Sequence, residues 1–371
     1  MVNELAAELG LDPIDFRLKN AAHEGTVRPD GLKNPRIGCV EVLETMKNHA
    51  HYDTPVDGTY KGRGVAIGFW FNIGFDSRCH IGVNADGTIT LVEGSTDIGG
   101  SRTSIAMQAA EVLGIPAESV HPSVADTDTD TVGYTAMTDG SRTTFETGWA
   151  AYEAAQDAKR QMTERASQIW DVDADRVELD DGVFKSKSDP ELSLSFADLS
   201  AQLSATGGPI TGRAAVNPQG AGGSYAGNTV DIDVDPDTGK VTVTRFTTVQ
   251  DAGKAIHPSY VEGQMQGGSV QGIGWALNEE YFMNPDGGMD NSSLLDYRIP
   301  TILDLPMIDT VIVEVANPGH PFGVRGVGEA NIVPPLAAVA NAVADAIGTR
   351  ITELPMNPAA VRSAIRSKNG N

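Results

Sequence analysis

Three glycine turns, each just before a predicted helix, are the first candidates for chemistry in this sequence: Gly99-Gly100, Gly140-Ser141 and Gly326-Val-Gly328. Backbone N–H groups at such a turn, together with the positive end of a helix dipole, favour phosphate or another anion. A single turn of this kind is equally well explained by ordinary chain reversal. Three together favour a large phosphorylated cofactor. A nicotinamide dinucleotide is disfavoured, because its fingerprint needs a third glycine between a strand and a helix.

Glu329 is the candidate general base. It ends the segment Phe322-Gly-Val-Arg-Gly-Val-Gly-Glu329, whose glycines leave room for a bulky cofactor. The helix that follows would favour the ionised carboxylate through its dipole, and a carboxylate can accept a proton from a reacting group. The alternative is that Glu329 only caps that helix, since acidic residues are favoured at helix starts.

Strands and helices that position these residues are predicted from hydrophobic periodicity. Alternating apolar residues predict antiparallel strands at residues 64–71, 80–83, 89–93, 230–234 and 241–246. Helical spacing predicts helices at residues 144–169, 260–277 and 335–347. Each glycine turn therefore stands at a junction between predicted elements.

Two of these segments carry an unusual residue pattern. In the strand at 230–234, Asp231 and Asp233 alternate with apolar residues, which predicts a solvent-facing side. The helix at 260–277 contains five glycines, and each costs about 1 kcal/mol relative to alanine. Another group must therefore approach this helix closely.

Composition limits the class of protein. Apolar residues make up 40% of the 371 residues and charged residues 21%, which excludes collagen and membrane bundles and permits a sizeable core. Fifty acidic residues against 27 basic ones give a net charge of −23, so nucleic acid is not an expected partner. Scarce lysine and abundant aspartate are typical of adaptation to high salt.

The N-terminal residues carry acidic side chains and no continuous apolar run, so we expect no secretory signal. No stretch approaches 18 uninterrupted apolar residues, and we expect a cytoplasmic protein without a membrane partner. The two cysteines are too few to hold an iron–sulfur cluster with four thiolates. The seven histidines are scattered without ligand spacing, so we expect no metal ligand from the protein.

Several compound motifs resemble one family. The segments at residues 326–329, 334–335, 341–346 and 354–358 are similar to the end of molybdenum hydroxylase large subunits, the xanthine dehydrogenase, aldehyde oxidase and carbon monoxide dehydrogenase family. Residues 249–258 and 263–274 are similar to another long block of that family, and residues 5–20 to one of its helices. The resemblance covers nearly the whole chain.

The resemblance implies an α+β fold of interleaved molybdopterin-binding domains, with mixed and antiparallel sheets flanked by helices. Residues 1–60 would be a helical remnant of the first molybdopterin-binding domain and a linker. Residues 61–225 would form the second such domain, and residues 226–371 the C-terminal portion carrying the Glu329 loop.

The resemblance also implies the cofactor, molybdenum held by molybdopterin, expected as the cytosine dinucleotide. Glu329 would be the catalytic base, and an aromatic run would line the substrate channel: Phe69, Trp70 and Phe71. The cofactor would be contacted by Gly99, Gly100, Ser101, Arg102, Gly140, Ser141, Arg142, Gln264, Gly267, Gly268, Gly326 and Gly328. Where much of the family has Gly-Gln-Gly, this chain has Gly99-Gly100-Ser101-Arg102, so Arg102 would replace the glutamine on a phosphate.

The family's first cofactor segment and its arginine-containing substrate loop have no counterpart in this sequence. Either a complementary N-terminal polypeptide or segment supplies them, or the gene is broken. The expected protein is thus the catalytic part of a hydroxylase that oxidises an aldehyde or N-heterocycle carbon with water as the oxygen source. It would need partner chains carrying 2Fe-2S clusters and FAD. The alternatives are a non-catalytic assembly or remnant fragment and, last, a nicotinamide-linked dehydrogenase.

Overall fold

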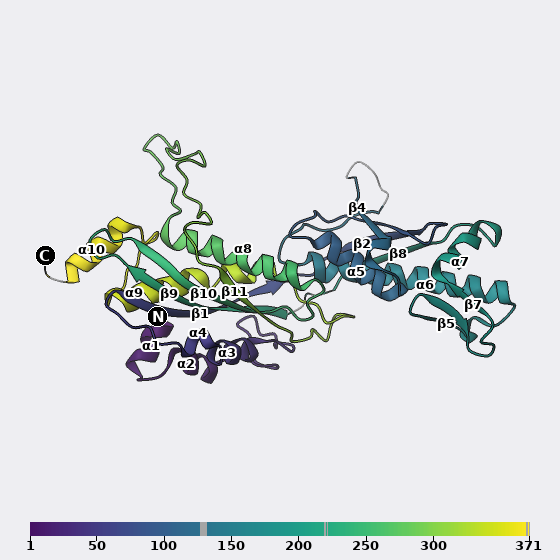
Figure 1. The fold of residues 1–371 in the computed structure, drawn as a ribbon, viewed down its shortest axis with the longest axis horizontal. Coiled ribbons are helices and arrows are strands. Elements are labelled where there is room, and N and C mark those ends of the chain that lie inside the picture. Colours follow the sequence, from purple (N-terminus) through teal and green to yellow (C-terminus); the bar gives the residue numbers. More distant parts are fainter. Residues whose placement is uncertain (127–131, 219, 221, 369, 371) are drawn as a thin grey trace. The chain divides into compact units, whose positions relative to one another are not determined.

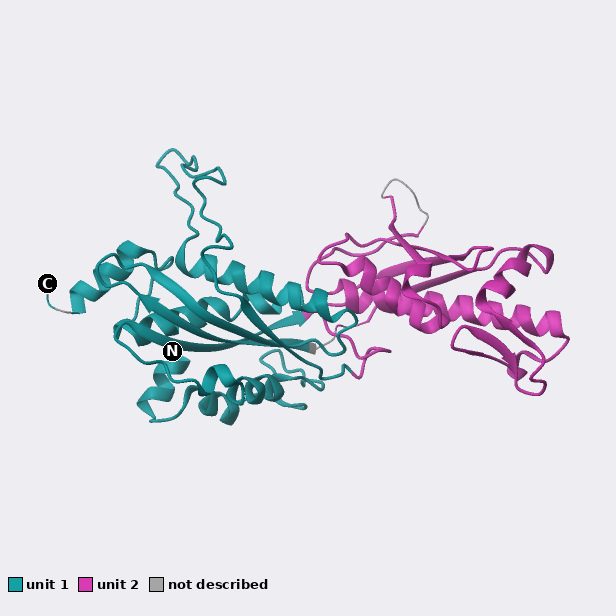
Figure 2. Ribbon diagram, in the orientation of Figure 1, with its two compact units in different colours: residues 1–71, 222–317, 327–371 teal, residues 72–221, 318–326 magenta. Residues whose placement is uncertain are grey.

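The computed structural model describes residues 1–126, 132–218, 220, 222–368 and 370. These residues form two compact units that alternate along the chain (Figures 1 and 2). Unit 1 contains residues 1–71, 222–317 and 327–371, and unit 2 contains residues 72–221 and 318–326. Residues 1–60 and, apart from residues 318–326, residues 226–371 of the predicted domain division thus lie in unit 1. The division itself stays a prediction.

Unit 1 is built on a four-stranded sheet with the order β1-β9-β10-β11. The strands are β1 (Lys61–Asn72, whose last residue belongs to unit 2), β9 (Gly222–Val234), β10 (Val241–Asp251) and β11 (Ile308–Val313). Strands β9 and β10 form an antiparallel hairpin, and β11 joins β10 in parallel. The helices are α1 (Val2–Glu8), α2 (Pro13–Lys19), α3 (Cys39–Lys47), α4 (Ala50–Asp53), α8 (Pro258–Leu277), α9 (Pro335–Ile347) and α10 (Pro358–Lys368), with the 3-10 turn η5 (Ala330–Ile332).

Helices cover both faces of this sheet, and strand β10 shows how the residues divide between them. Phe246 packs with α8 and α9, whereas Val249, three residues on, packs with α2 and α3. Successive side chains of a strand point to opposite faces, so the even positions from 246 to 250 share the α8 and α9 side. Glycines of β1 let α9 approach: a Cβ on Gly64 would lie 1.9 Å from the Ala338 carbonyl oxygen.

Unit 2 contains two further sheets, with the strand orders β4-β3-β2-β8 and β5-β6-β7. The strands are β2 (Ser77–Val83), β3 (Ile89–Glu93), β4 (Val120–Val124), β5 (Val177–Asp180), β6 (Val183–Ser186), β7 (Ser193–Ser195) and β8 (Thr211–Val216). The helical elements are α5 (Ser101–Leu113), η1 (Ala117–Ser119), the π-helical turn η2 (Thr143–Thr147), α6 (Gly148–Trp170), η3 (Ala174–Arg176), α7 (Phe196–Gln202) and η4 (Leu203–Ala205).

Small side chains allow α6 to lie close to the larger sheet of unit 2. Ala151, Ala154 and Ala158 are fully buried in one core with residues of β2 and β3. Strand β8 contributes Gly212, where a Cβ would lie 2.1 Å from the Ala154 carbonyl oxygen. The alanine-rich sequence of this helix therefore reflects close packing on a sheet.

The predicted α+β class, with mixed and antiparallel sheets flanked by helices, is confirmed. The hairpins β2–β3 and β9–β10 and the helices α8 and α9 lie where hydrophobic periodicity places them. The strand expected at residues 64–71 is β1, which pairs with β9 and lies in a different sheet from β2 and β3. Neighbouring strands in sequence can belong to different sheets when a domain is built from separated segments.

Within the described residues, one window, Ala330–Ile347, is long and apolar enough to cross a membrane by composition. It is interrupted by the junction between η5 and α9. The α9 part contributes buried core side chains, among them Ala338, Val339, Ala342 and Val343. A core helix of unit 1 therefore explains the apolar composition.

Candidate cofactor site

Two of the predicted glycine turns meet in unit 2. Gly140 has φ +63, and a Cβ there would lie 1.8 Å from the Ile73 side chain. A Cβ on Gly326 would lie 1.7 Å from the carbonyl oxygen of Ser141. Asn72 holds Gly326 from both sides, because its Oδ1 accepts from the Gly326 N–H at 3.2 Å and its Nδ2 donates to the Gly326 carbonyl at 3.4 Å. Only glycine permits this approach.

The third turn of unit 2 begins α5. Gly99 and Gly100 have φ +60 and +78, and the hydroxyl of Ser101 accepts a hydrogen bond from the Ile98 N–H. The segment before this turn is joined to the segment before Gly140, because the Thr96 N–H donates to the Thr138 hydroxyl at 2.9 Å. The structure thus brings the turns at 99–101, 140–141 and 326 into one part of unit 2.

Arg102 stands at the start of α5 beside Asp97. Its backbone N–H donates to Asp97 Oδ1 at 3.2 Å, and its Nε lies 3.6 Å from Asp97 Oδ2. Both side chains are partly exposed. A phosphate at this turn would therefore compete with the Asp97 carboxylate for the Arg102 guanidinium, and the predicted phosphate contact stays a prediction.

Arg142 is fully buried and binds unit 2 itself. Its Nε donates to the Gly74 carbonyl at 2.9 Å and lies 3.1 Å from Glu146 Oε2. The two terminal nitrogens donate to four further acceptors: the carbonyls of Ala136, Met137 and Asp76 and the Ser77 hydroxyl. These contacts use the guanidinium's five N–H groups. The side chain therefore fixes the turn after Ser141, and a cofactor contact at this position is left to the backbone.

The partner of Arg142 lies in the π-helical turn η2. Glu146 is fully buried, and burial raises its pKa to about 7 against the opposing effect of Arg142. Turns of this type occur mostly as short interruptions of helices and often at functional sites. Here η2 joins the Ser141 turn to α6, so this buried pair anchors one wall of the candidate site.

His320 is a buried histidine in a turn of the same unit. Its ring centroid lies 5.5 Å from those of Phe145 and Trp149, and Nδ1 accepts from the Phe322 N–H at 3.0 Å. Burial lowers the His320 pKa to about 4. The neutral ring therefore holds residues 318–326 against η2.

This histidine predicts a pH dependence of stability. Between pH 4 and the unfolded pKa of about 6.5, the unfolded chain binds a proton at His320 that the folded chain does not, so stability rises with pH in this window. Across this pH window, the free energy of unfolding should increase by about 2 to 3 kcal/mol more in the wild type than in His320→Asn. Urea titrations monitored through tryptophan fluorescence measure the difference between the two proteins, in which the contribution of Glu146 cancels. Equal slopes in the two proteins would contradict the assignment.

Glu329 lies in unit 1 at the N-cap of η5, where its side chain makes no cap hydrogen bond. The turn is fixed to the sheet because the Thr248 hydroxyl of β10 donates to Asn331 Oδ1 at 2.7 Å, and both side chains are fully buried. It also packs on α8, since a Cβ on Gly268 would lie 3.0 Å from the Asn331 Cβ. The alternative, in which Glu329 only caps the helical turn that follows, is not supported, because the Glu329 side chain makes no cap hydrogen bond.

Further polar groups lie beside this turn. Gln250 is fully buried on β10, and its Nε2 donates to the Ser224 hydroxyl at 3.1 Å and to the Val327 carbonyl at 3.4 Å. Among the described residues, Gln250 Oε1 and Asn331 Nδ2 are buried without a hydrogen-bond partner. A buried polar atom without a partner costs about 1–3 kcal/mol, so both atoms are available to a polar ligand.

The five glycines of α8 divide into two groups. A Cβ on Gly268, Gly272 or Gly274 would meet η5, Pro335 or Glu279 and Pro300 within about 3 Å, which explains three of them by packing inside unit 1. A Cβ on Gly263 or Gly267 would meet nothing within 4 Å. Packing in unit 1 therefore does not explain these two glycines, and Gly267 is one of the predicted cofactor contacts.

The molybdopterin cofactor-binding domain family matches residues 40–306, more than half of the chain. The chain belongs to this family. The putative xanthine dehydrogenase molybdenum-binding subunit of Escherichia coli K12 is 32% identical over 96% of this chain and 50% of its own length. The nicotine 6-hydroxylase large subunit of Paenarthrobacter nicotinovorans is 28% identical over 99% of this chain and 49% of its own. This molybdopterin-binding chain thus spans about half the length of the curated relatives it matches.

Solved structures show the same fold. Reconstituted CO dehydrogenase from Oligotropha carboxidovorans superposes with a TM-score of 0.87 at 23% identity, covering 100% of this chain and 50% of that one. The aldehyde oxidoreductase from Desulfovibrio desulfuricans ATCC 27774 superposes with a TM-score of 0.77 at 26% identity, covering 98% of this chain and 39% of that one. The predicted resemblance to the molybdopterin-binding subunits of molybdenum hydroxylases is confirmed.

The predicted channel residues of the molybdopterin-binding chain lie at the end of β1. Phe69 and Phe71 are about half exposed, so they are not core residues of a buried strand. The Phe69 ring lies 5.7 Å from Tyr225, and Trp70 stacks on Phe71 at 5.0 Å. An exposed aromatic group suits a wall for a flat substrate, and the channel role stays a prediction.

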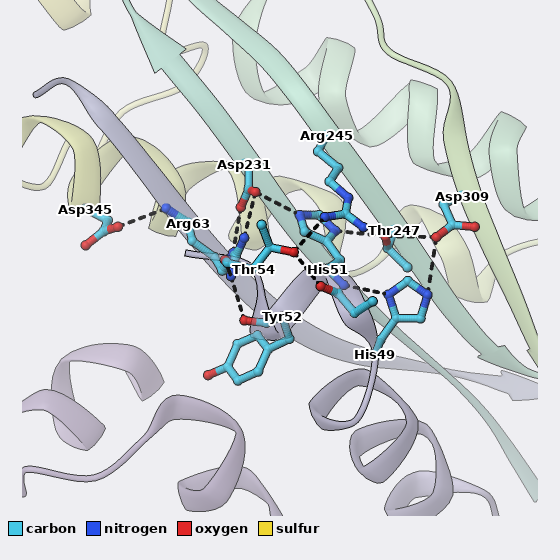
Figure 3. A network of polar contacts seen from close by, with 11 residues as sticks. His49, His51, Tyr52, Thr54, Arg63, Asp231, Arg245, Thr247, Asp309 and Asp345 are labelled. Carbon is cyan, nitrogen blue, oxygen red and sulfur yellow. Dashed lines mark hydrogen bonds and ion pairs between the residues drawn. The ribbon is translucent and has the colours of Figure 1, made fainter. Parts of the chain in front are cut away.

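The other large polar network of unit 1 lies on the α4 side of the sheet (Figure 3). Asp231 accepts two hydrogen bonds from Arg63, at 2.6 and 2.7 Å, and its Oδ2 lies 3.1 Å from the Nε2 of fully buried His51. The predicted solvent exposure of Asp231 is wrong, because β1 and α4 cover this part of β9. Asp233 is half exposed beside Lys61, as predicted. This network attaches α4 to the sheet.

Sequence reasoning missed the residues that hold the candidate site. Asn72 and Asn331 each stand within two residues of a singled-out position, but asparagine is common in turns and carried no distinguishing signal. Gln250 lies inside the block at residues 249–258 that carried the family resemblance, and this position could have been weighed. Groups of three or more histidine, cysteine or acidic side chains suited to a metal ion are absent from the residues that the structure describes.

Proposed function

We propose that this chain is the molybdopterin-binding part of a molybdenum hydroxylase, an oxidoreductase that oxidises an aldehyde or N-heterocycle carbon with water as the oxygen source. The family match and the names of its relatives, a putative xanthine dehydrogenase subunit, a nicotine 6-hydroxylase subunit and an aldehyde oxidoreductase subunit, support this reaction class. One observation carries the proposal: η5 presents Glu329 on a turn fixed by the buried Thr248–Asn331 hydrogen bond and by the packing of Asn331 on Gly268 of α8.

The residues present fit a large phosphorylated cofactor. Gly267 leaves open space on α8, and Gln250 Oε1 and Asn331 Nδ2 are buried polar atoms that a heterocycle could satisfy. We assign the cofactor contacts to the predicted set: Gly99, Gly100, Ser101, Arg102, Gly140, Ser141, the Arg142 backbone, Gln264, Gly267, Gly268, Gly326 and Gly328. Molybdopterin with molybdenum, expected as the cytosine dinucleotide, would supply the two-electron oxidation of the substrate carbon.

Glu329 is assigned as the proton acceptor. A general base needs a carboxylate within hydrogen-bond reach of the proton it removes and a backbone that keeps it there. Buried contacts on two sides of η5 meet the second requirement. Glu329 also follows Gly326 by only three residues in the chain. It would accept the proton released as the oxygen nucleophile attacks, while Phe69, Trp70 and Phe71 orient a flat substrate.

Partner chains complete the proposal. Cys39 and Cys79 are both buried, and burial raises the pKa of each thiol, so neither is suited to an exposed cluster. We therefore place the 2Fe-2S clusters and FAD on other chains and expect a complementary molybdopterin-binding polypeptide to supply the rest of the pocket. Cytoplasmic location and adaptation to high salt are proposed from composition.

Metal and pterin analysis tests the function directly. The protein is purified from its own cells through an affinity tag, and molybdenum and pterin are measured per chain. We expect about one of each, together with a dye-reducing activity on aldehydes or N-heterocycles. A complex that forms without molybdenum would favour the alternative, a non-catalytic assembly or remnant fragment. A bound nicotinamide dinucleotide without pterin would favour a dehydrogenase.

Gly267→Ala tests the cofactor contact on α8. The new methyl group would meet nothing within 4 Å in the free chain, so alanine should stabilise the helix by about 0.5–1 kcal/mol. If the cofactor approaches Gly267, the same methyl group should lower molybdenum content at least about fivefold. Gly263→Ala is the matched control, because it also faces open space but is no assigned contact. Full molybdenum content in Gly267→Ala would remove this contact from the proposal.

A further inference from the structure

The segment from Glu279 to Met307 is a long excursion between α8 and β11, which we term the apolar arm. Figure 1 shows it leaving the end of α8 and returning to the body of unit 1. Five large apolar side chains on it are 82–94% exposed: Leu294, Leu295, Ile302, Leu303 and Met307. Tyr281, Phe282, Met283 and Ile299 are also more than half exposed. Apolar exposure of this extent marks an interaction site in a soluble protein.

The arm is internally ordered despite this exposure. Asn291 is buried within it, donating to the Glu280 carbonyl at 2.7 Å and accepting from the Phe282 N–H at 2.9 Å. The Tyr297 hydroxyl donates to Glu279 Oε2 at 2.8 Å, and Met283 pairs with Met289 in a β-bridge. Polar groups are thus satisfied inside the arm while its aliphatic groups point outward. This is the reverse of the arrangement that an isolated surface loop adopts.

The base of the arm continues the same surface onto α8. Trp275, one turn before the arm begins, is also more than half exposed. Interface cores are enriched in aromatic and methionine side chains, and the arm with this tryptophan carries several of each. A pre-ordered segment also loses little conformational entropy when it is bound. The arm and Trp275, which precedes it by four residues in the chain, therefore carry the side chains that a docking surface needs.

We propose that the apolar arm docks into the polypeptide that supplies the half of the relatives' length lying outside this chain. The relatives matched by this chain are about twice as long, so an equally large body of structure is the expected neighbour. The arm carries six carboxylates against one arginine. Its partner surface should accordingly be an apolar cleft with a basic rim. This inference rests on the proposed function, because a complementary half is expected only of a molybdopterin-binding subunit.

Cross-linking identifies the occupant. A photoreactive phenylalanine analogue replaces Leu295 in the affinity-tagged chain, the complex is purified from its own cells, and cross-linked peptides are sequenced by mass spectrometry. We expect peptides whose sequences align with the part of the relatives that this chain does not span. Cross-links to a second copy of this chain, to lipid, or to nothing would each overturn the proposal.

Paired variants measure the contribution of the arm. Leu294→Asp with Leu295→Asp should weaken assembly roughly tenfold or more, because charged groups replace two apolar side chains that the partner would bury. Assembly is measured by light scattering after size-exclusion chromatography at graded dilution. Leu294→Met with Leu295→Met keeps the apolar surface and is the matched control. This control should assemble within about twofold of the wild type. Unchanged melting of the isolated variant chain shows that the arm variants fold.

The outcomes separate this inference from the proposed function. A complex that needs Leu294 and Leu295 but contains no molybdenum would overturn the function and leave the docking surface standing. A molybdenum-loaded complex that is indifferent to Leu294→Asp with Leu295→Asp would overturn the docking surface alone.

Discussion

Replacing the proposed base by its amide, Glu329→Gln, is expected to lower turnover about 10²–10⁴-fold, the usual contribution of a positioned general base. Glutamine keeps the size of the side chain but cannot accept the proton. The turn itself should persist, because it is fixed by the Thr248–Asn331 hydrogen bond and by the packing of Asn331 on Gly268 of α8. Molybdenum content should therefore stay at the wild-type level while substrate-dependent dye reduction falls.

Glu353→Gln provides the matched control, because Glu353 is an exposed acid of the same unit and lies outside the assigned site. This variant should retain wild-type turnover. The decisive comparison is turnover per bound molybdenum, using whichever aldehyde or N-heterocycle the wild-type complex oxidises. If Glu329→Gln turned over at the wild-type rate per molybdenum, Glu329 would lose its assignment as the base.

Arg142→Met is expected to destabilise unit 2 by about 3–5 kcal/mol, the usual cost of removing one partner from a buried ion pair. The methionine would leave the Glu146 carboxylate without its cation and would remove the Arg142 donor from three carbonyl oxygens, those of Gly74, Ala136 and Met137. The Asp76 carbonyl would keep its hydrogen bond from the Ala136 N–H. Urea unfolding followed through tryptophan fluorescence and far-UV circular dichroism gives the free energy of unfolding. An effect below about 1 kcal/mol would show that the hydrogen bonds of Arg142 are dispensable.

Two further measurements identify the cause of that loss. Arg142→Lys keeps the positive charge but not the planar set of five donors, so it should cost less than Arg142→Met. The deficit should also shrink on acidification, because Glu146 with a pKa near 7 becomes neutral and no longer needs a cation. A deficit that grew as the pH fell through 7 would contradict this explanation.

The apolar arm and the glycine pattern of α8 lead to a common conclusion about this chain. Gly268, Gly272 and Gly274 are explained by packing inside unit 1, whereas a Cβ on Gly267 would meet nothing within 4 Å, and the arm exposes large aliphatic side chains. The open space at Gly267 is assigned here to a bound cofactor, and the exposed side chains of the arm to a bound partner. The hydrophobic cores of both units are thus formed within this chain, whereas Gly267 and the apolar arm are explained by the proposed cofactor and partner.

Local sequence determined the individual elements. The β9–β10 hairpin, α8 and α9 follow from apolar spacing and turn residues, since hydrogen bonds and side-chain contacts within an element link residues only a few positions apart. The glycine turns and Glu329 were also identified from the sequence, because three glycine turns, each before a predicted helix, together favour a bound phosphorylated cofactor. The family resemblance depended on the same short blocks.

Tertiary structure alone decided which of these elements meet. It paired β1 with β9, brought Asp231 onto Arg63, 168 residues away in the chain, and buried Arg142 and His320 in unit 2. Periodicity registers only whether a position faces a core, whereas the identity of its neighbour depends on how distant segments cross. The polar supports of the Glu329 turn, Thr248 and Asn331, come from segments 83 residues apart, and no local pattern records that contact.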